Sequence, residues 1–304
     1  MRKTTVLTWL WKQKNSRFLY SAEHVNTWAE QILRNTTLPI ELACVTDMPE
    51  GIDGSIRIIP IPEDNFEEIK VATWSENKGF PQCFRRISMF SPHAADIFGE
   101  RFVCMDLDMI VTKNIDHVIG FNSDFKIMRG TNIGKRPYNG GLIAMEAGSR
   151  PQVFNKFSYE GARRACKLYV GSDQAWISYC LGWCEDVFNF ENDGVAFLFR
   201  NKIRELMNNS VDLNRMTMGF FPGEPKFFHS GDVFKAYAEE VRFMNELFDQ
   251  DVWDEDEATV VNPPYEQLSK GNGKCAVPRI RMETLGTLQH KNIVNGDLYL
   301  VFQN

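Results

Sequence analysis

The chain has 304 residues, of which 43% are hydrophobic and 24% charged, and its formal net charge is −6. This length allows one large domain, or one domain with an appendage, and a sizeable core. No run of roughly 18 apolar residues is present, so we expect no membrane-spanning helix. The negative charge does not favour a long nucleic-acid footprint. The basic start of the sequence lacks the apolar stretch of a signal peptide, and we predict a cytoplasmic protein.

The seven cysteines are scattered without a regular spacing. Such a distribution is typical of a reducing compartment rather than of a disulfide framework. Cys180 and Cys184 are close enough in sequence to suggest a metal pair, but no second pair and no nearby histidine complete the site. We therefore interpret both as core residues.

The first part of the chain alternates strand-like and helix-like segments. In chain order we predict a strand over 4–9, a helix after Ser21, strands over 40–45 and 55–61, a helix from Pro81 and a strand over 101–106. Alternation of this kind predicts an α/β fold with a mainly parallel sheet flanked by helices. Ligands bind such sheets beyond the carboxyl ends of the strands.

The second part continues with shorter elements. We predict a strand over 125–128, a turn region over 130–141, a strand over 142–145, helices over about 152–169 and from Ser172, a strand over 226–229 and a helix over 234–248. From residue 249 onward the periodicity weakens and turn residues become frequent. We therefore divide the chain into a domain over 1–248 and a C-terminal extension over 249–304.

Asp106 and Asp108 are the strongest chemical signal in the sequence. They follow the apolar residues 102–105 (FVCM) and precede 109–111 (MIV), which places both at the end of a buried strand. Carboxylate oxygens are the ligands that Mg²⁺ and Mn²⁺ prefer, and two acids in an apolar run are costly to bury without a counter-charge. The sequence therefore predicts a divalent-cation site, with His229, after another apolar strand, as the candidate third ligand.

Residues 102–116 (FVCMDLDMIVTKNID) resemble the DxD segment of GT-A-fold glycosyltransferases. The similarity is greatest to the glycogenin-like family 8 and its bacterial and phage relatives. Residues 138–145 (YNGGLIAM), 171–177 (GSDQAWI) and 227–231 (FFHSG) resemble three further segments of that family, in the same order. The resemblance implies that residues 1–248 are a GT-A catalytic domain. It also implies a nucleotide-sugar donor, a UDP-sugar, bound through Mn²⁺ or Mg²⁺ on Asp106, Asp108 and His229.

The resemblance also implies roles for residues outside the metal site. The donor sugar and the acceptor would be oriented by Asn139, Asp173 and Gln174, and the close approach of backbone to sugar would be allowed by Gly140 and Gly141. The donor diphosphate would be met by Arg86, in preference to Arg85, while the base and ribose would be bordered by Thr8, Trp9 and Asp47. The family pattern usually continues to Lys-Pro-Trp after its final glycine, whereas residues 231–235 read GDVFK. This departure weakens the assignment of Lys235 as a phosphate contact.

Two other functions compete with this interpretation. In haloacid-dehalogenase phosphatases a DxD motif supplies a nucleophilic aspartate, but it stands near the N-terminus and a later acidic pair completes the site. Here Asp106 follows three predicted strands, and Ala236 stands four residues after Asp232 where that pair would need an acid. A non-catalytic GT-A-like module is the second alternative, and retention of both aspartates argues against it.

The acceptor and the stereochemistry stay open at this level. A glycan, a lipid-linked glycan or a protein hydroxyl is the expected acceptor. A modified base in phage DNA is possible, because local basic clusters occur at residues 126–136 and 163–167, but the overall acidity does not favour it. The resemblance suggests retention of the anomeric configuration, and no residue stands out as a catalytic base.

Overall fold

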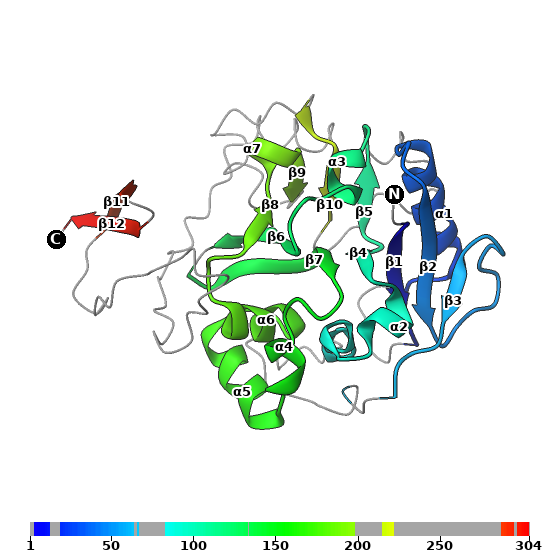
Figure 1. The fold of residues 1–304 in the computed structure, drawn as a ribbon, viewed down its shortest axis with the longest axis horizontal. Coiled ribbons are helices and arrows are strands. Elements are labelled where there is room, and N and C mark those ends of the chain that lie inside the picture. The colour runs from blue at the N-terminus through cyan, green and yellow to red at the C-terminus, as the bar shows by residue number, and fades with distance from the viewer. Residues whose placement is uncertain are drawn as a thin grey trace.

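The computed structural model describes residues 3–12, 19–63, 66, 83–132, 134–197, 215–221, 287–294 and 297–303. A seven-stranded sheet of order β3-β2-β1-β4-β7-β6-β8 forms its centre, with helices packed around it (Figure 1). The predicted α/β fold with a mainly parallel sheet is confirmed. A three-stranded sheet of order β5-β10-β9 lies beside it, and β11 and β12 form a two-stranded sheet of their own.

Four parallel strands make up one side of the central sheet: β1 (Thr4–Leu10), β2 (Ile40–Thr46), β3 (Arg57–Ile59) and β4 (Arg101–Met105). Every residue of β1 is buried, which explains why the strand is a continuous apolar and threonine run rather than an alternating one. Alternate residues point to opposite faces, so Val6 and Leu7 belong to two different core clusters.

The other side of the sheet contains β6 (Phe125–Asn132), β7 (Arg136–Glu146) and β8 (Asp186–Phe188). Strand β7 runs antiparallel to both β4 and β6, whereas β6 and β8 are parallel. The predicted turn over 130–141 is wrong, because most of it belongs to β6 and β7. A Cβ on Gly130 would lie 1.8 Å from the carbonyl oxygen of Arg136, so this glycine allows two strands to approach closely.

Helices cover the sheet on both faces. In chain order they are α1 (Ala22–Arg34), the 3-10 helix η3 (Phe84–Phe90), α2 (Ala94–Phe98), α3 (Asp116–Ile119), α4 (Gln152–Asn155), α5 (Tyr159–Leu168), α6 (Asp173–Leu181) and α7 (Phe190–Asp193). The single helix predicted over 152–169 is two helices. Ser158 accepts a hydrogen bond from the Gly161 amide and starts α5 as an N-cap, which breaks the run.

The smaller sheet is built from β5 (Met109–Val111), β9 (Val195–Phe197) and β10 (Met218–Phe220). It packs into the same core cluster as α1 and α3. The C-terminal strands are β11 (Thr287–Val294) and β12 (Asp297–Gln303). The division at residue 248 stays a prediction, and the elements predicted over 226–229 and 234–248 lie outside the described residues.

The described cysteines are mostly buried thiols. Five of them are free: Cys44, Cys83, Cys104, Cys166 and Cys180. Burial raises the pKa of the Cys180 thiol to about 12, which fits the predicted role as a core residue. Cys184 is the exception to the expected reduced state, because it is disulfide-bonded. Among the helices of the described ranges, none has both the length and the apolar character needed to cross a membrane.

Candidate active site

The two aspartates of the DxD segment lie at the carboxyl edge of the sheet, where β4 ends beside the longer β7. The last residue of β4, Met105, pairs with Leu142, and the Asp106 amide then donates to the carbonyl of Gly141 at 2.8 Å. Strand β7 begins five residues earlier, at Arg136, so it extends past the end of β4. The carbonyl of Asp108 accepts from the Phe221 amide at 2.8 Å, which attaches the smaller sheet to the same edge.

Arg86 joins the main parts of this site. Its Nη1 lies 2.7 Å from Asp106 Oδ1, its Nε lies 3.5 Å from Asp173 Oδ2, and its Nη2 donates to the carbonyl of Gly140. The side chains of Arg86 and Asp173 are only 6% and 8% exposed, whereas that of Asp106 is 36% exposed. One buried cation therefore connects a carboxylate of β4, a carboxylate of α6 and the backbone of β7.

Burial and charge act in opposite directions on these groups. Burial lowers the pKa of the Arg86 guanidinium, but the neighbouring Asp106, Cys104 and Asp173 outweigh it and hold that pKa well above its ordinary value. Burial raises the pKa of the Asp173 carboxyl, and Arg86 offsets the rise only in part. Burial also raises the pKa of the Cys104 thiol to about 12, so this cysteine is a neutral neighbour of the pair. Arg86 is thus a permanent cation that stabilises two carboxylates.

Two glycines let the backbone of β7 approach these side chains. A Cβ on Gly140 would lie 3.1 Å from Asp173 Oδ2 and 3.5 Å from Arg86 Nη2. A Cβ on Gly141 would lie 3.4 Å from Asp106 Oδ2 and 2.9 Å from the side-chain oxygen of Asn139. That oxygen accepts from the Gly141 amide at 2.7 Å. The structure therefore brings Asn139, Gly140 and Gly141 together with Asp106 and Asp173.

The start of α6 is fixed by contacts with the preceding loop. The side-chain Nε2 of Gln174 donates to the carbonyl of Val170 at 2.9 Å, and the backbone amide of Cys83 donates to Ser172 Oγ at 2.9 Å. Gly171 has φ +111°, and a Cβ there would overlap the Gln174 side chain at 2.4 Å. Gln174 lies next to the site, but its amide nitrogen is committed to the loop.

Of the three residues predicted to contact the base and ribose, two are buried in a strand and one lies at the strand ends. Thr8 and Trp9 lie inside β1, which continues to Leu10, and both are buried. Trp9 packs against Trp11 and Phe98 in the core. The expected role of Thr8 and Trp9 as residues that border the base and ribose stays a prediction. Asp47 does lie at the strand ends, because its Oδ1 accepts from the Lys12 amide at 2.9 Å.

The predicted contact of Arg86 with a donor diphosphate stays a prediction. Within the protein, Arg86 contacts two carboxylates and one carbonyl group. The sequence did not reveal the contacts of Cys104 with Arg86, or of Phe220 and Phe221 with β7 and Asp108. No pattern in the sequence signals these, since β10 has only three residues. His229 and Lys235 lie outside the described residues.

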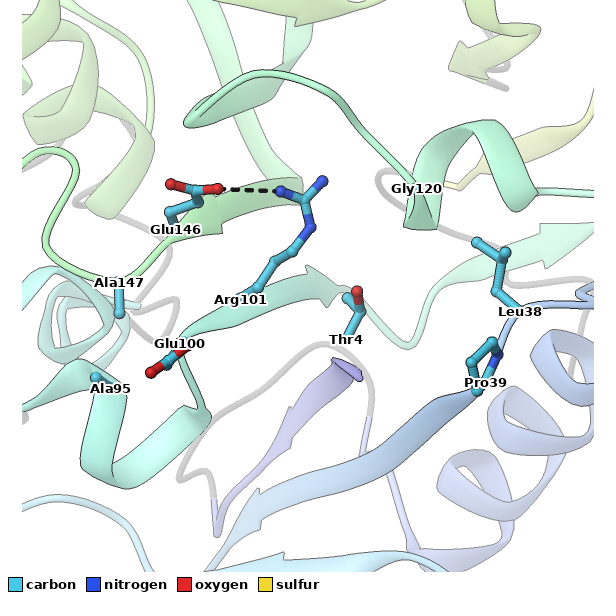
Figure 2. Close-up of a pocket in the computed structure, with 9 residues that line it drawn as sticks. All are labelled: Thr4, Leu38, Pro39, Ala95, Glu100, Arg101, Gly120, Glu146 and Ala147. Carbon is cyan, nitrogen blue, oxygen red and sulfur yellow. Dashed lines mark hydrogen bonds and ion pairs between the residues drawn. The ribbon is translucent and has the colours of Figure 1, made fainter. Parts of the chain in front are cut away.

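A pocket of about 540 Å³ lies at the opposite edge of the sheet (Figure 2). Its lining residues are Thr4, Leu38, Pro39, Ala95, Glu100, Arg101, Gly120, Glu146 and Ala147. Thr4 and Arg101 begin β1 and β4, so this is the amino edge. Arg101 pairs with Glu146 at 3.3 Å and lies 3.6 Å from the ring centroid of Phe121, so its charge is already satisfied. Asp106 follows the other end of β4, and this pocket is therefore separate from the candidate site.

Comparison with known proteins shows the fold. No family model matches the sequence, and no curated protein matches it either. The structure is similar to galactosyltransferase LgtC in complex with donor and acceptor sugar analogs, with 10% identity and a TM-score of 0.50 over 83% of this chain and 98% of that chain. It is also similar to the apo form of glycosyltransferase GlyE of Streptococcus pneumoniae, with 10% identity and a TM-score of 0.47 over 83% and 64% of the two chains. For mouse xyloside xylosyltransferase 1 the identity is 10% and the TM-score 0.47 over 72% and 98%.

At this level of identity the likeness to LgtC establishes the fold alone. The chain has the mixed α/β architecture of GT-A glycosyltransferases, as the sequence predicted. Membership of family 8 stays a prediction.

Proposed function

We propose that this protein is a glycosyltransferase that moves a sugar from a nucleotide-sugar, a UDP-sugar, to a hydroxyl group of an acceptor. The observation that carries the proposal is the placement of Asp106 and Asp108. In a GT-A-type fold they lie at the carboxyl edge of β4, beside the glycine pair of β7. This edge is where open α/β sheets bind ligands.

The acidic pair fits a divalent cation. Both aspartates are half-buried and Leu107 between them is buried, so the two carboxylates are presented from one short and well-anchored segment. Arg86 contacts Asp106 at Oδ1, and Oδ2 is on the side of Gly141. Asp106, Asp108 and, from outside the described residues, His229 would hold Mn²⁺ or Mg²⁺. When bound, such an ion offsets the negative charge that grows on the departing nucleotide diphosphate.

Asp173 fits the role of a sugar-binding residue. Its Oδ2 and the Nε of Arg86 are both buried, and neither makes a hydrogen bond within the described part of the chain. A buried acceptor without a donor is costly, and a hydroxyl of the donor sugar would satisfy it. Gly140 leaves the space beside Oδ2 open, because any larger residue would place a Cβ there at 3.1 Å. The side-chain oxygen of Asn139 holds the backbone of residues 139–141 in place by accepting a hydrogen bond from the Gly141 amide.

In the proposed reaction the bond between the anomeric carbon and the diphosphate oxygen breaks, and the acceptor oxygen forms a new bond to that carbon. The acceptor hydroxyl releases its proton to solvent, and the nucleoside diphosphate leaves with the bonding electron pair. Arg86 acts indirectly, by holding Asp106 and Asp173 in position.

A panel of nucleotide-sugars tests this proposal. With Mn²⁺ present we expect turnover of at least one donor, detected as release of the nucleoside diphosphate. Asp108→Asn should reduce the rate by at least about 100-fold, since one removed charge-stabilising group typically costs that much. Asp96→Asn removes an exposed carboxylate of α2 and is the matched control that should keep the wild-type rate. The proposal fails if no donor is turned over, or if Asp108→Asn is as active as the control.

A further inference from the structure

The hairpin of β6 and β7 carries a second group of charged residues next to the candidate site. Arg136 begins β7, and Val170 of the loop before α6 donates its amide to the carbonyl of Lys135 at 2.8 Å. In Figure 1 this end of the β6–β7 pair projects from the sheet, with α5 and α6 on one side of it. The start of β7 and the start of α6 are therefore neighbours.

Strand alternation shows which way Arg136 faces. Gly140 adjoins Asp173 and Arg86, and Tyr138 lies in the core cluster that contains Trp176 of α6. Residues two apart in a strand point to the same face, so Arg136 is on the α6 side as well. Arg136 is four positions before Gly140, a span of roughly 13 Å along an extended strand. An acceptor that reacts beside Gly140 could reach this arginine with a neighbouring substituent.

The charge of Arg136 is poorly satisfied. Within the described part of the chain its polar contact is a 3.4 Å approach of Nη1 to Thr131 Oγ1, and its Nε is buried without a hydrogen bond. Burial lowers the pKa of this guanidinium, and no carboxylate of the described residues acts against it. By contrast, Arg86 contacts two carboxylates, and so does Arg150, through Asp124 and Glu185. A partly desolvated cation without a counter-ion is costly, and an anionic ligand would offset that cost.

We propose that Arg136 forms an anion subsite that recognises a phosphate group carried by the acceptor. The planar guanidinium matches phosphate geometry. Arg129 supports the subsite: it is exposed on β6 and pairs with Tyr138, two positions along β7 from Arg136, with a register irregularity between the two. Two arginines suit a single phosphate, whereas a nucleic acid would need a longer basic surface than this chain of net charge −6 offers. This inference rests on the proposed function, because it concerns the acceptor of that reaction.

A calorimetric titration with a small phosphate tests the subsite. Glycerol 3-phosphate is titrated into protein saturated with UDP and Mn²⁺, so that the donor site is already filled, and glycerol is the neutral probe. We expect glycerol 3-phosphate to bind at least about tenfold more tightly to wild type than to Arg136→Gln, and glycerol to bind neither. Arg34→Gln removes the same charge from the exposed end of α1 and should behave as wild type. Arg136→Lys keeps the charge but not the planar guanidinium, so its affinity for glycerol 3-phosphate should lie between those of wild type and Arg136→Gln.

A second assay identifies the source of the phosphate, and the titration separates the two proposals. Sedimentation with phosphatidylcholine vesicles that contain a polyprenyl phosphate, compared with plain vesicles, distinguishes a lipid-linked acceptor from a soluble one. Equal affinity of wild type and Arg136→Gln for glycerol 3-phosphate overturns the subsite, and so does tighter binding of a short oligonucleotide. If UDP and Mn²⁺ do not bind at all, the proposed function fails, while the titration repeated without UDP still decides whether Arg136 binds phosphate.

Discussion

Arg86 is the residue whose removal should disturb this protein most. In Arg86→Met the Asp173 carboxylate stays 8% exposed and loses its cation, and Asp106 loses the 2.7 Å contact that orients it. Removing one partner of a buried pair typically costs about 3–5 kcal/mol of the free energy of unfolding. Asp173→Asn should cost less, about 1–2 kcal/mol, because Arg86 keeps Asp106 as its partner.

The double variant decides whether these effects are coupled. Once Asp173 is neutral, loss of Arg86 leaves no fully buried charge behind, so the double variant should be more stable than additivity predicts, by roughly 1–3 kcal/mol. Urea unfolding followed by circular dichroism measures all three free energies, with Arg86→Lys as a milder variant if Arg86→Met does not fold. Burial raises the pKa of Asp173, and loss of Arg86 raises it further, so the cost of Arg86→Met is full above that raised pKa and shrinks as the pH falls through it. A cost below about 1 kcal/mol for Arg86→Met, or strict additivity, would refute this account.

Three further predictions follow from individual contacts. Gly140→Ala would place a Cβ 3.1 Å from Asp173 Oδ2 and should lower donor turnover about tenfold, the effect of raising the activation barrier by roughly 1.4 kcal/mol. Gly54→Ala is the control, because a Cβ there meets nothing within 4 Å, and it should keep the wild-type rate. Equal rates for the two variants would refute this prediction. Because the pKa of Asp173 is raised, the acid limb of kcat/KM should lie above the ordinary aspartate range and disappear in Asp173→Asn, and an unchanged pH profile would exclude the carboxylate from the reaction. Desolvation raises the pKa of Asp116, but hydrogen bonds from Thr36 and Thr37 outweigh it and lower that pKa overall. Asp116→Asn should therefore cost about 1 kcal/mol near pH 7 after solvent screening, and this cost should begin to fall below the ordinary aspartate pKa of about 4 and be lost as the pH passes through the lowered pKa. A pH-independent difference in urea midpoints would contradict this prediction.

The sequence predicted the parts of the site that are set by local patterns. A fully buried strand reads as an apolar run, so the end of β4 and the aspartates after it could be located to within a residue. Ser172 before α6 marked that helix start in the same way. Both signals depend on residues that are adjacent in the chain, so they can be recognised in a single sequence.

The role of Arg86 could not be predicted, because its partners are 20 to 87 residues away in sequence. Phe84, Ile87 and Phe90 recur every third residue, which is the period of the observed 3-10 helix, whereas Arg86 is buried on another face of that helix. An arginine is expected at the surface, and only the two carboxylates around it explain its burial. The prediction of a turn over 136–141 was wrong for a similar reason. Its Gly, Asn and Pro residues favour turns locally, but pairing with β6 keeps the segment extended.

The central claim is that Asp106 and Asp108 hold the cation that binds the donor diphosphate. Isothermal titration of UDP with and without Mn²⁺ tests it most directly. We predict that Mn²⁺ increases the affinity of the wild type for UDP by at least about tenfold, that Asp108→Asn loses this increase, and that Asp96→Asn keeps it. An affinity for UDP that is the same with and without Mn²⁺, or an increase that survives in Asp108→Asn, would contradict the account.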